Sequence, residues 1–103
     1  MRRPGSLIVK DPQSDEPQGF DWTTWLTELG PGVTISTSVW TITGPDSVLT
    51  KHDESIVTGN LKTQAYFAAG TAGRKYTITN HVVTNSAPAV TDERSFTYLI
   101  SNR

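Results

Sequence analysis

The chain has 103 residues, and 9 basic side chains against 10 acidic ones give it a formal net charge of -1. This length fits one ordinary domain with a single core, and the absence of cysteine excludes disulfides and thiolate sites while fitting synthesis in a reducing cytoplasm. Because the charges are scattered, no electrostatic footprint for nucleic acid or for an anionic membrane is visible.

The first 18 residues are expected to form an arm or linker ahead of a domain that spans residues 19–103. Pro4, Pro12 and Pro17 interrupt regular structure in this segment. It begins with basic residues, but its apolar stretch at residues 7–9 is too short for a signal peptide, and no apolar run in the chain is long enough to cross a bilayer. Whether the arm is mobile, or whether residues 7–9 form a short edge strand, stays open at this stage.

A short helix is predicted after the arm, because apolar side chains follow the i, i+3, i+4, i+7 spacing of one helical face. These side chains are Trp22, Trp25, Leu26 and Leu29. Asp21 or Thr23 is expected to cap the start of the helix, and the Gly-Pro-Gly sequence at residues 30–32 is expected to end it.

Residues 33–42 predict a strand with a β-bulge near residues 36–38. Val33 and Ile35 fall on one parity of the alternation, whereas Trp40 and Ile42 fall on the other. One extra residue reverses the phase of a strand, so a bulge restores a single inward face. We expect Trp40 to be the central aromatic residue of the core.

The rest of the chain predicts further short strands separated by turns. Two of them, at residues 48–49 and 55–57, are expected on either side of a polar loop at residues 51–54. A hairpin turn at Gly59 and Asn60 leads to the next. The remaining strands are predicted at residues 61–69, 76–84 and 94–100, with a proline-containing loop at residues 85–89.

Gly73 and Tyr76 are predicted to form a structural corner. A glycine-bounded turn at residues 70–73 is followed by a tyrosine and then by strict alternation of polar and apolar residues. In immunoglobulin-like domains a tyrosine at this place ties a loop to its strand through its hydroxyl group. With about seven short strands and at most one short helix, the sequence predicts an all-β, immunoglobulin-like (fibronectin III-like) antiparallel β-sandwich.

No cluster of residues predicts a catalytic, cofactor-binding or metal site. His52 and His81 are far apart in the sequence, and a zinc site needs further converging ligands. His52 stands beside Asp53 and Glu54, but neighbours in an extended segment point to opposite faces and form no acid–base dyad by themselves. The glycines at residues 70–73 precede a strand, so they lack the helix N-terminus of a phosphate loop. We therefore expect no enzyme and no cofactor.

The candidate interface residues are Asp21, Trp22, Trp25 and Arg94. Tryptophan is enriched in interface hot spots, although Trp22 and Trp25 also suit a structural role at one end of the sandwich, which we favour. Asp21, Asp92 and Arg94 are candidates for a charge pair near the same end.

Several segments in a fixed order resemble a family of small virion structural proteins of tailed bacteriophages, described as fiber–tail adaptor or head–tail-region proteins. The matching segments are residues 9–12, 20–26, 35–42, 70–73, 76–80 and 92–96. The resemblance implies an immunoglobulin-like fold and a non-enzymatic protein that sits in the virion, in multiple copies, and binds other virion proteins of the tail, fiber or capsid. It implies synthesis in the cytoplasm of the bacterial host.

Two other classes of protein stay open. The chain is also compatible with a capsid decoration protein or with an adhesion or carbohydrate-binding module, in which Trp22 or Trp25 stacks on sugar rings. A small hydrolase requires a pocket with a strongly perturbed titratable group.

Overall fold

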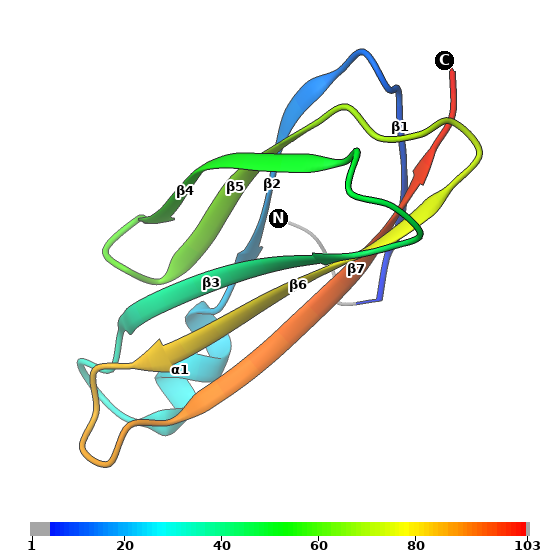
Figure 1. Cartoon of the computed structure of the whole chain (residues 1–103). Helices are drawn as coiled ribbons and strands as arrows, with labels where there is room; N and C mark the ends of the chain where they lie inside the picture. The colour runs from blue at the N-terminus through cyan, green and yellow to red at the C-terminus, as the bar shows by residue number, and fades with distance from the viewer. Residues whose placement is uncertain (1–4, 103) are drawn as a thin grey trace.

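The computed structural model describes residues 5–102, which form two facing β-sheets and one short helix (Figure 1). One sheet has the strand order β1-β7-β6-β3 and the other has the order β2-β5-β4. Their bounds are β1 Leu7–Lys10, β2 Asp15–Asp21, α1 Thr23–Leu29, β3 Ile35–Thr43, β4 Thr50–Val57, β5 Lys62–Ala68, β6 Lys75–Thr84 and β7 Thr91–Ile100. The predicted all-β sandwich with seven strands and one short helix is confirmed. All pairs are antiparallel except β1 with β7.

The core lies between the two sheets and is rich in aromatic rings. Alternate residues of β6 and β7 point inward because successive side chains of a strand face opposite sides. Trp40 is 2% exposed, and its ring stacks on Phe20 with the centroids 5.8 Å apart and meets Phe67 edge-on at 5.6 Å. The central position predicted for Trp40 is therefore confirmed.

A register shift in β3 confirms the predicted bulge. The pairing of β3 with β6 is irregular between Ile35 and Thr37 and regular from there to Thr43. Ile35 and Trp40 are both buried although they lie on opposite parities. The extra residue reverses the phase between them and gives the strand one inward face.

Within the expected arm, residues 7–18 supply β1 and the first part of β2, so the short edge strand left open at residues 7–9 is present. Pro17 is compatible with β2, since Trp22 donates to the carbonyl of Leu61, the residue before β5, and the odd-numbered residues of β2 therefore face the free edge of the sheet. The missing N–H of Pro17 thus removes no ladder bond. The mobility expected of the arm stays a prediction, and its basic start at residues 1–4 lies outside the described residues.

The prediction of two short strands around a polar loop at residues 51–54 was wrong. The polar segment belongs to one continuous strand, β4, whose pairing with β5 is irregular between His52 and Ser55. β4 is an edge strand with its first five residues exposed, so it needs no alternation of apolar side chains. The hairpin turn at Gly59 and Asn60 is confirmed, with φ of 66° and 62°.

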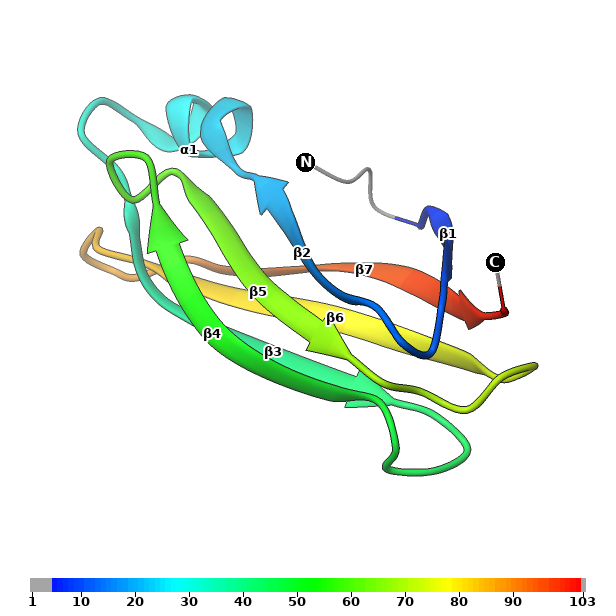
Figure 2. The ribbon, with the colours of Figure 1, turned by 90° about the horizontal axis from the view of Figure 1, so that it is seen from above.

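The two ends of the sandwich carry different loops (Figure 2). We call the end with α1 and the loops at residues 30–34, 58–61 and 85–90 the helical end. The opposite end carries the loops at residues 11–14, 44–49 and 69–74, and we call it the corner end. β1 lies toward the corner end, away from α1.

Candidate protein-interaction site

α1 starts at Thr23, and its N-cap position is Trp22, without a side-chain capping bond, so the cap predicted at Asp21 or Thr23 was wrong. Asp21 instead binds the first helical residue. A carboxylate oxygen of Asp21 accepts a bond from the Thr23 hydroxyl group and one from the main-chain N–H of Thr23 at 2.9 Å. Both bonds favour the ionised carboxylate and so lower the pKa of Asp21, and the bond from the Thr23 hydroxyl group has the larger effect. Gly30, with a φ of 144°, ends the helix as predicted. The helix is thereby held between two defined ends.

Trp22 anchors the helical end to the core. Its side chain is fully buried, and its Nε1–H donates to the Thr63 hydroxyl and to the Asn80 amide oxygen, both at 3.2 Å. Asn80 in turn donates to the Ser38 hydroxyl at 2.8 Å, so this network joins the two sheets. A satisfied buried network selects one arrangement of its members. Trp22 therefore has no surface to offer to a partner, whereas Trp25, whose ring centroid lies 5.3 Å away, is only partly buried.

Arg94 closes this cluster from β7. Its guanidinium lies 4.0 Å from the centroid of the Trp22 ring, which is a cation–π arrangement, and its Nη1–H donates to the main-chain carbonyl of Asp21 at 2.9 Å. Among the described residues, the carboxylate of Asp21 pairs with Lys62 at 3.9 Å, and no ion pair joins Arg94 to Asp21 or Asp92. The structure brings together all four candidate interface residues: Asp21, Trp22, Trp25 and Arg94.

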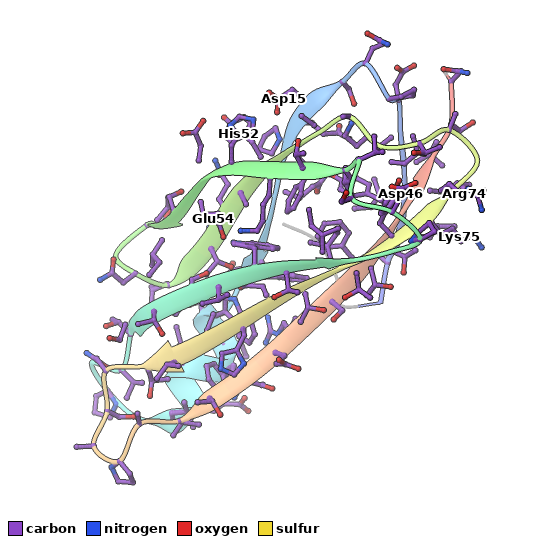
Figure 3. All side chains as sticks on the ribbon, in the orientation of Figure 1. Asp15, Asp46, His52, Glu54, Arg74 and Lys75 are labelled. Atoms are coloured by element: carbon purple, nitrogen blue, oxygen red, sulfur yellow. The ribbon has the colours of Figure 1, made fainter. Side chains whose placement is uncertain are left out.

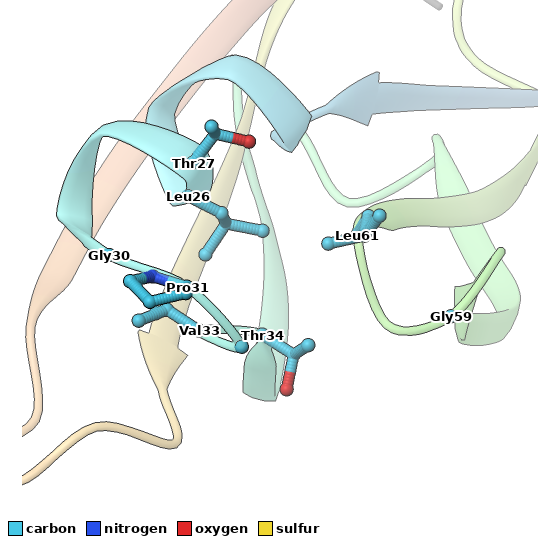
Figure 4. Close-up of a pocket in the computed structure, with 9 residues that line it drawn as sticks. Leu26, Thr27, Gly30, Pro31, Val33, Thr34, Gly59 and Leu61 are labelled. Atoms are coloured by element: carbon cyan, nitrogen blue, oxygen red, sulfur yellow. The ribbon is translucent and has the colours of Figure 1, made fainter.

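Beside α1 an open groove of about 460 Å³ runs between the helix and the turn from β4 to β5 (Figure 4). Three glycines form part of its wall, and the side chains that line it are uncharged: Leu26, Thr27, Pro31, Val33, Thr34 and Leu61. Sequence reasoning missed this groove, because its walls come from two separate segments, residues 26–34 and 59–61, with no shared motif. The Gly-Pro-Gly loop and the Gly59 turn were the only signals, and both indicated turns alone.

At the corner end, the structure places Tyr76 against the loops. The Tyr76 hydroxyl accepts a bond from the Thr71 N–H at 3.0 Å and donates to the carboxylate of Asp46. The bond from Tyr76, followed by one from the Val48 N–H, lowers the pKa of Asp46. Gly73 has a φ of 83°, and its N–H donates to the Ile100 carbonyl at 2.7 Å. Gly73 and Tyr76 thus fix one turn, far from the groove.

Comparison with protein families gives one match that covers most of the chain. A family model described as "Podophage GP4 fiber-tail adaptor protein gp77" matches residues 10–98. The chain belongs to this family. A search of curated proteins and a search of solved structures found no significant match.

In this family member the histidines are paired with carboxylates. His52 Nε2 lies 2.8 Å from both carboxylate oxygens of Asp15, and Nδ1 lies 2.7 Å from Asp53 (Figure 3). Asp15, and after it Asp53, raises the pKa of His52. His81 lies on the other sheet, 3.2 Å from Glu93.

Within residues 5–102, no group of three or more histidine, aspartate or glutamate side chains converges as metal ligands would. Over the same range no helix is long and apolar enough to span a membrane.

Proposed function

We propose that this chain is a non-enzymatic structural protein of a bacteriophage virion that joins tail and fiber proteins through protein–protein contacts. The observation that carries the proposal is the family match over residues 10–98. The protein is made in the host cytoplasm and enters the particle in several copies, so that contacts which are weak one by one add up to firm attachment.

The helical end is the contact surface in this proposal. Its groove is uncharged and lined in large part by apolar side chains, and desolvated apolar pockets are where interface energy concentrates. Trp25 and the exposed Leu29 lie on the same helix. The buried network of Trp22 and Asn80 supports the surface by holding α1 in one place, which lowers the entropic cost of binding.

We also infer that the sandwich is immunoglobulin-like, with Gly73 and Tyr76 as its tyrosine corner. The order β2-β5-β4 facing β7-β6-β3 corresponds to strands B-E-D facing G-F-C of that fold. Tyr76 stands near the start of β6, the equivalent of strand F, and its hydroxyl bonds to the main chain five residues upstream, at Thr71.

The burial of the aromatic residues argues against a carbohydrate-binding module. Sugar rings need exposed aromatic faces, but Trp22 and Trp40 are 0% and 2% exposed, and no aromatic residue is among the exposed large hydrophobic side chains of residues 5–102. A glycan array is expected to show no saturable binding.

Mass spectrometry of purified virions and of isolated tails tests the proposal. We expect the chain in both preparations, and its absence from mature virions would refute the proposal. Presence in capsids without tails would favour a capsid decoration protein.

A pair of variants on one helix tests the groove. Thr27 lines the groove, whereas Thr24 is an exposed residue of the same helix outside it. Thr27→Glu places a charge in the groove, so we expect its incorporation into virions to fall about tenfold or more, the effect of about 1.4 kcal/mol. Thr24→Glu adds the same charge and is expected to be incorporated like the parent chain. Equal incorporation of the two variants would exclude the groove.

A further inference from the structure

β1 leaves main-chain groups unpaired at the edge of the four-stranded sheet. In a parallel ladder the N–H and C=O of one residue point to the same side, and successive residues alternate. Thr97 of β7 donates to the Ser6 carbonyl at 2.8 Å, so Leu7 directs its main-chain groups away from β7, and Val9 does the same. Within residues 5–102, the amides and carbonyls of Leu7 and Val9 have no hydrogen-bond partner.

The side chains at this edge are aliphatic and exposed. Leu7 is 58% exposed and Val9 is 42% exposed. Val9 pairs with the half-buried Leu99 of β7, so the apolar strip continues from the edge onto the outer face of the sheet. Free backbone groups next to exposed aliphatic side chains are a template for another strand.

Each of the other three sheet edges carries a feature that hinders strand addition. On β2, Pro17 has no N–H, and the Asp21 carbonyl accepts its bond from Arg94. On β3, the Trp40 N–H donates to the carboxylate of Glu54 at 3.4 Å. β4 bends at Asp53, where φ is 51°.

Charges and a break in register complete the protection of β4, whose exposed first half carries Lys51, His52, Asp53 and Glu54. Proline, bulges and charged side chains are the devices that keep edges from pairing. The two residues of β1 that face its free edge carry none of them.

The carboxylate of Glu16, on the edge strand β2 of the other sheet, indicates which side chains a strand added to β1 would carry. β1 and β2 lie along the same side of the sandwich (Figure 2). Glu16 of β2 shares the inward parity of Phe20, and its Oε1 is buried without a hydrogen-bond partner within residues 5–102. If a strand is added to β1, its inward-facing side chains enter the side of the sandwich on which β2 lies, and a lysine or arginine among them would complement the carboxylate of Glu16.

We propose that the β1 edge is a second attachment surface, which accepts an extended segment of another virion protein as an added strand. The segment carries aliphatic side chains on the face it shares with Leu7 and Val9 and a basic side chain on the face toward Glu16. This inference rests on the proposed function. An adaptor joins two partners, so it needs two separate surfaces, and β1 lies away from the groove.

An extended chain suits this edge because only a strand presents N–H and C=O groups at the matching spacing. Leu7 and Val9 together offer two donors and two acceptors, so an added strand gains up to four main-chain hydrogen bonds. Each bond has a modest net effect, and repeated copies in one particle raise the total strength.

Amide hydrogen exchange, compared between the free chain and intact virions, tests the added strand directly. In the free chain the amides of Leu7 and Val9 are expected to exchange rapidly. In virions we expect their exchange to slow by about 100-fold or more, as for ladder amides that open only with local unfolding. Unchanged exchange in virions that contain the chain would overturn the proposal.

Substitutions at Val9 separate strand addition from folding. Val9→Pro removes an N–H that makes no bond within the chain, and we expect incorporation into virions to fall at least about tenfold. Val9→Thr keeps the N–H and the β-branched shape and is the matched control, expected to be incorporated normally. If Val9→Pro lowers the denaturation midpoint of the free chain, the incorporation of Val9→Lys tests the edge instead. This variant leaves the backbone intact and places a charge on the edge.

The failures of the two proposals are distinguishable. Absence of the parent chain from virions refutes the adaptor function and the edge inference together. Normal incorporation of a folded Val9→Pro or of Val9→Lys refutes the edge inference alone, and the groove variants Thr27→Glu and Thr24→Glu are unaffected by that outcome.

Discussion

Both ends of the sandwich have glycines in their loops, but the space around these glycines differs between the ends. At the corner end, a β-carbon on Gly70 would lie 2.8 Å from Ile100 Cγ1, and one on Gly44 would overlap the Tyr76 ring. At the helical end, a β-carbon on Gly32 or Gly59 meets no atom within 4 Å. Two corner-end glycines, Gly44 and Gly70, are therefore packed tightly against side chains, although a β-carbon on Gly73 would meet no atom within 4 Å. The helical end keeps open space beside Gly32 and Gly59.

Polar groups show the same contrast between the ends. At the corner end, the ammonium of the fully buried Lys10 donates to the carbonyls of Asp11, Ser14 and Ala69 at 3.0, 2.7 and 2.8 Å. These bonds tie the loop after β1 to the loop after β5. At the helical end the buried polar network lies beneath the surface, and the groove outside it stays uncharged. The corner end is therefore tied together by bonds between its own loops, and the groove at the helical end is the contact surface that we propose.

The largest expected effect comes from adding one methyl group at each end. Gly44→Ala drives a β-carbon into the buried Tyr76 ring, and we expect a loss of about 3 kcal/mol in the free energy of unfolding. Gly32→Ala enters open space and bears only the strain of a φ of 75°, about 1 kcal/mol. Urea denaturation measures both changes. Equal losses would remove the contrast in packing between the ends.

Removal of the corner hydroxyl group is the next effect. Tyr76→Phe keeps the ring but breaks the bonds to Asp46 and Thr71, so we expect a loss of about 2 kcal/mol in the same measurement. Tyr66→Phe, on the outer face of β5, is the control and is expected to change stability little. An unchanged denaturation midpoint for Tyr76→Phe would argue against a corner that supports the fold.

At the helical end, loss of a charged contact is expected to cost less. Arg94→Leu removes the cation–π contact with Trp22 and the bond to the Asp21 carbonyl, and we expect about 1 kcal/mol of destabilisation by thermal or urea unfolding. Arg74→Leu, an exposed substitution at the corner end, is the control. A loss well above that of Tyr76→Phe would show that the helical end also maintains the fold.

The smallest expected effect is a pH dependence of stability that comes from His52, which lies on β4 and outside the loops of both ends. His52 joins the edge strands β2 and β4 through Asp15, and its pKa is raised in the folded chain. A raised folded pKa means that the stabilisation is fully present below the unfolded value of 6.5 and is lost as the pH rises through the folded pKa. We expect the melting temperature of the parent chain to fall toward that of His52→Gln over this range. A difference between the two chains that grows with rising pH would contradict the ion pair.

Much of the fold could be predicted from local sequence patterns. Ile35 and Trp40 required a bulge, because one inward face cannot hold both parities without it. β4 was not predicted as one strand because its first five residues are exposed, so this edge strand shows no alternation of polar and apolar side chains there. β1 was left open as a possible short edge strand at residues 7–9, since its parallel partner β7 lies about ninety residues further along the chain and a four-residue strand carries little signal of its own.

The four candidate interface residues lie together at one end, but their contacts differ from those expected, and their role at an interface stays a prediction. The residues proposed for the interface do meet at one end, yet Arg94 contacts the ring of Trp22 and a carbonyl, where a charge pair with Asp21 or Asp92 had been expected. The Nε1–H of the buried Trp22 donates to Asn80, a polar residue on the inward face of β6 whose partners cannot be read from the strand pattern. The groove depends on how α1 and the loop after it are placed against the turn at residues 59–61, which only tertiary structure defines.

The parallel pairing of β1 and β7 has a mechanical consequence. A pull applied at the start of β1 and at the end of β7 acts along the strands in opposite directions, so the hydrogen bonds between them are loaded in shear and must break together. Peeling a hairpin would break its bonds one at a time, at lower force. Under load the lifetime of a domain depends on its unfolding rate rather than on its equilibrium stability. Four paired residues, Leu7 with Thr97 through Lys10 with Ile100, would thus set how long the sandwich resists tension.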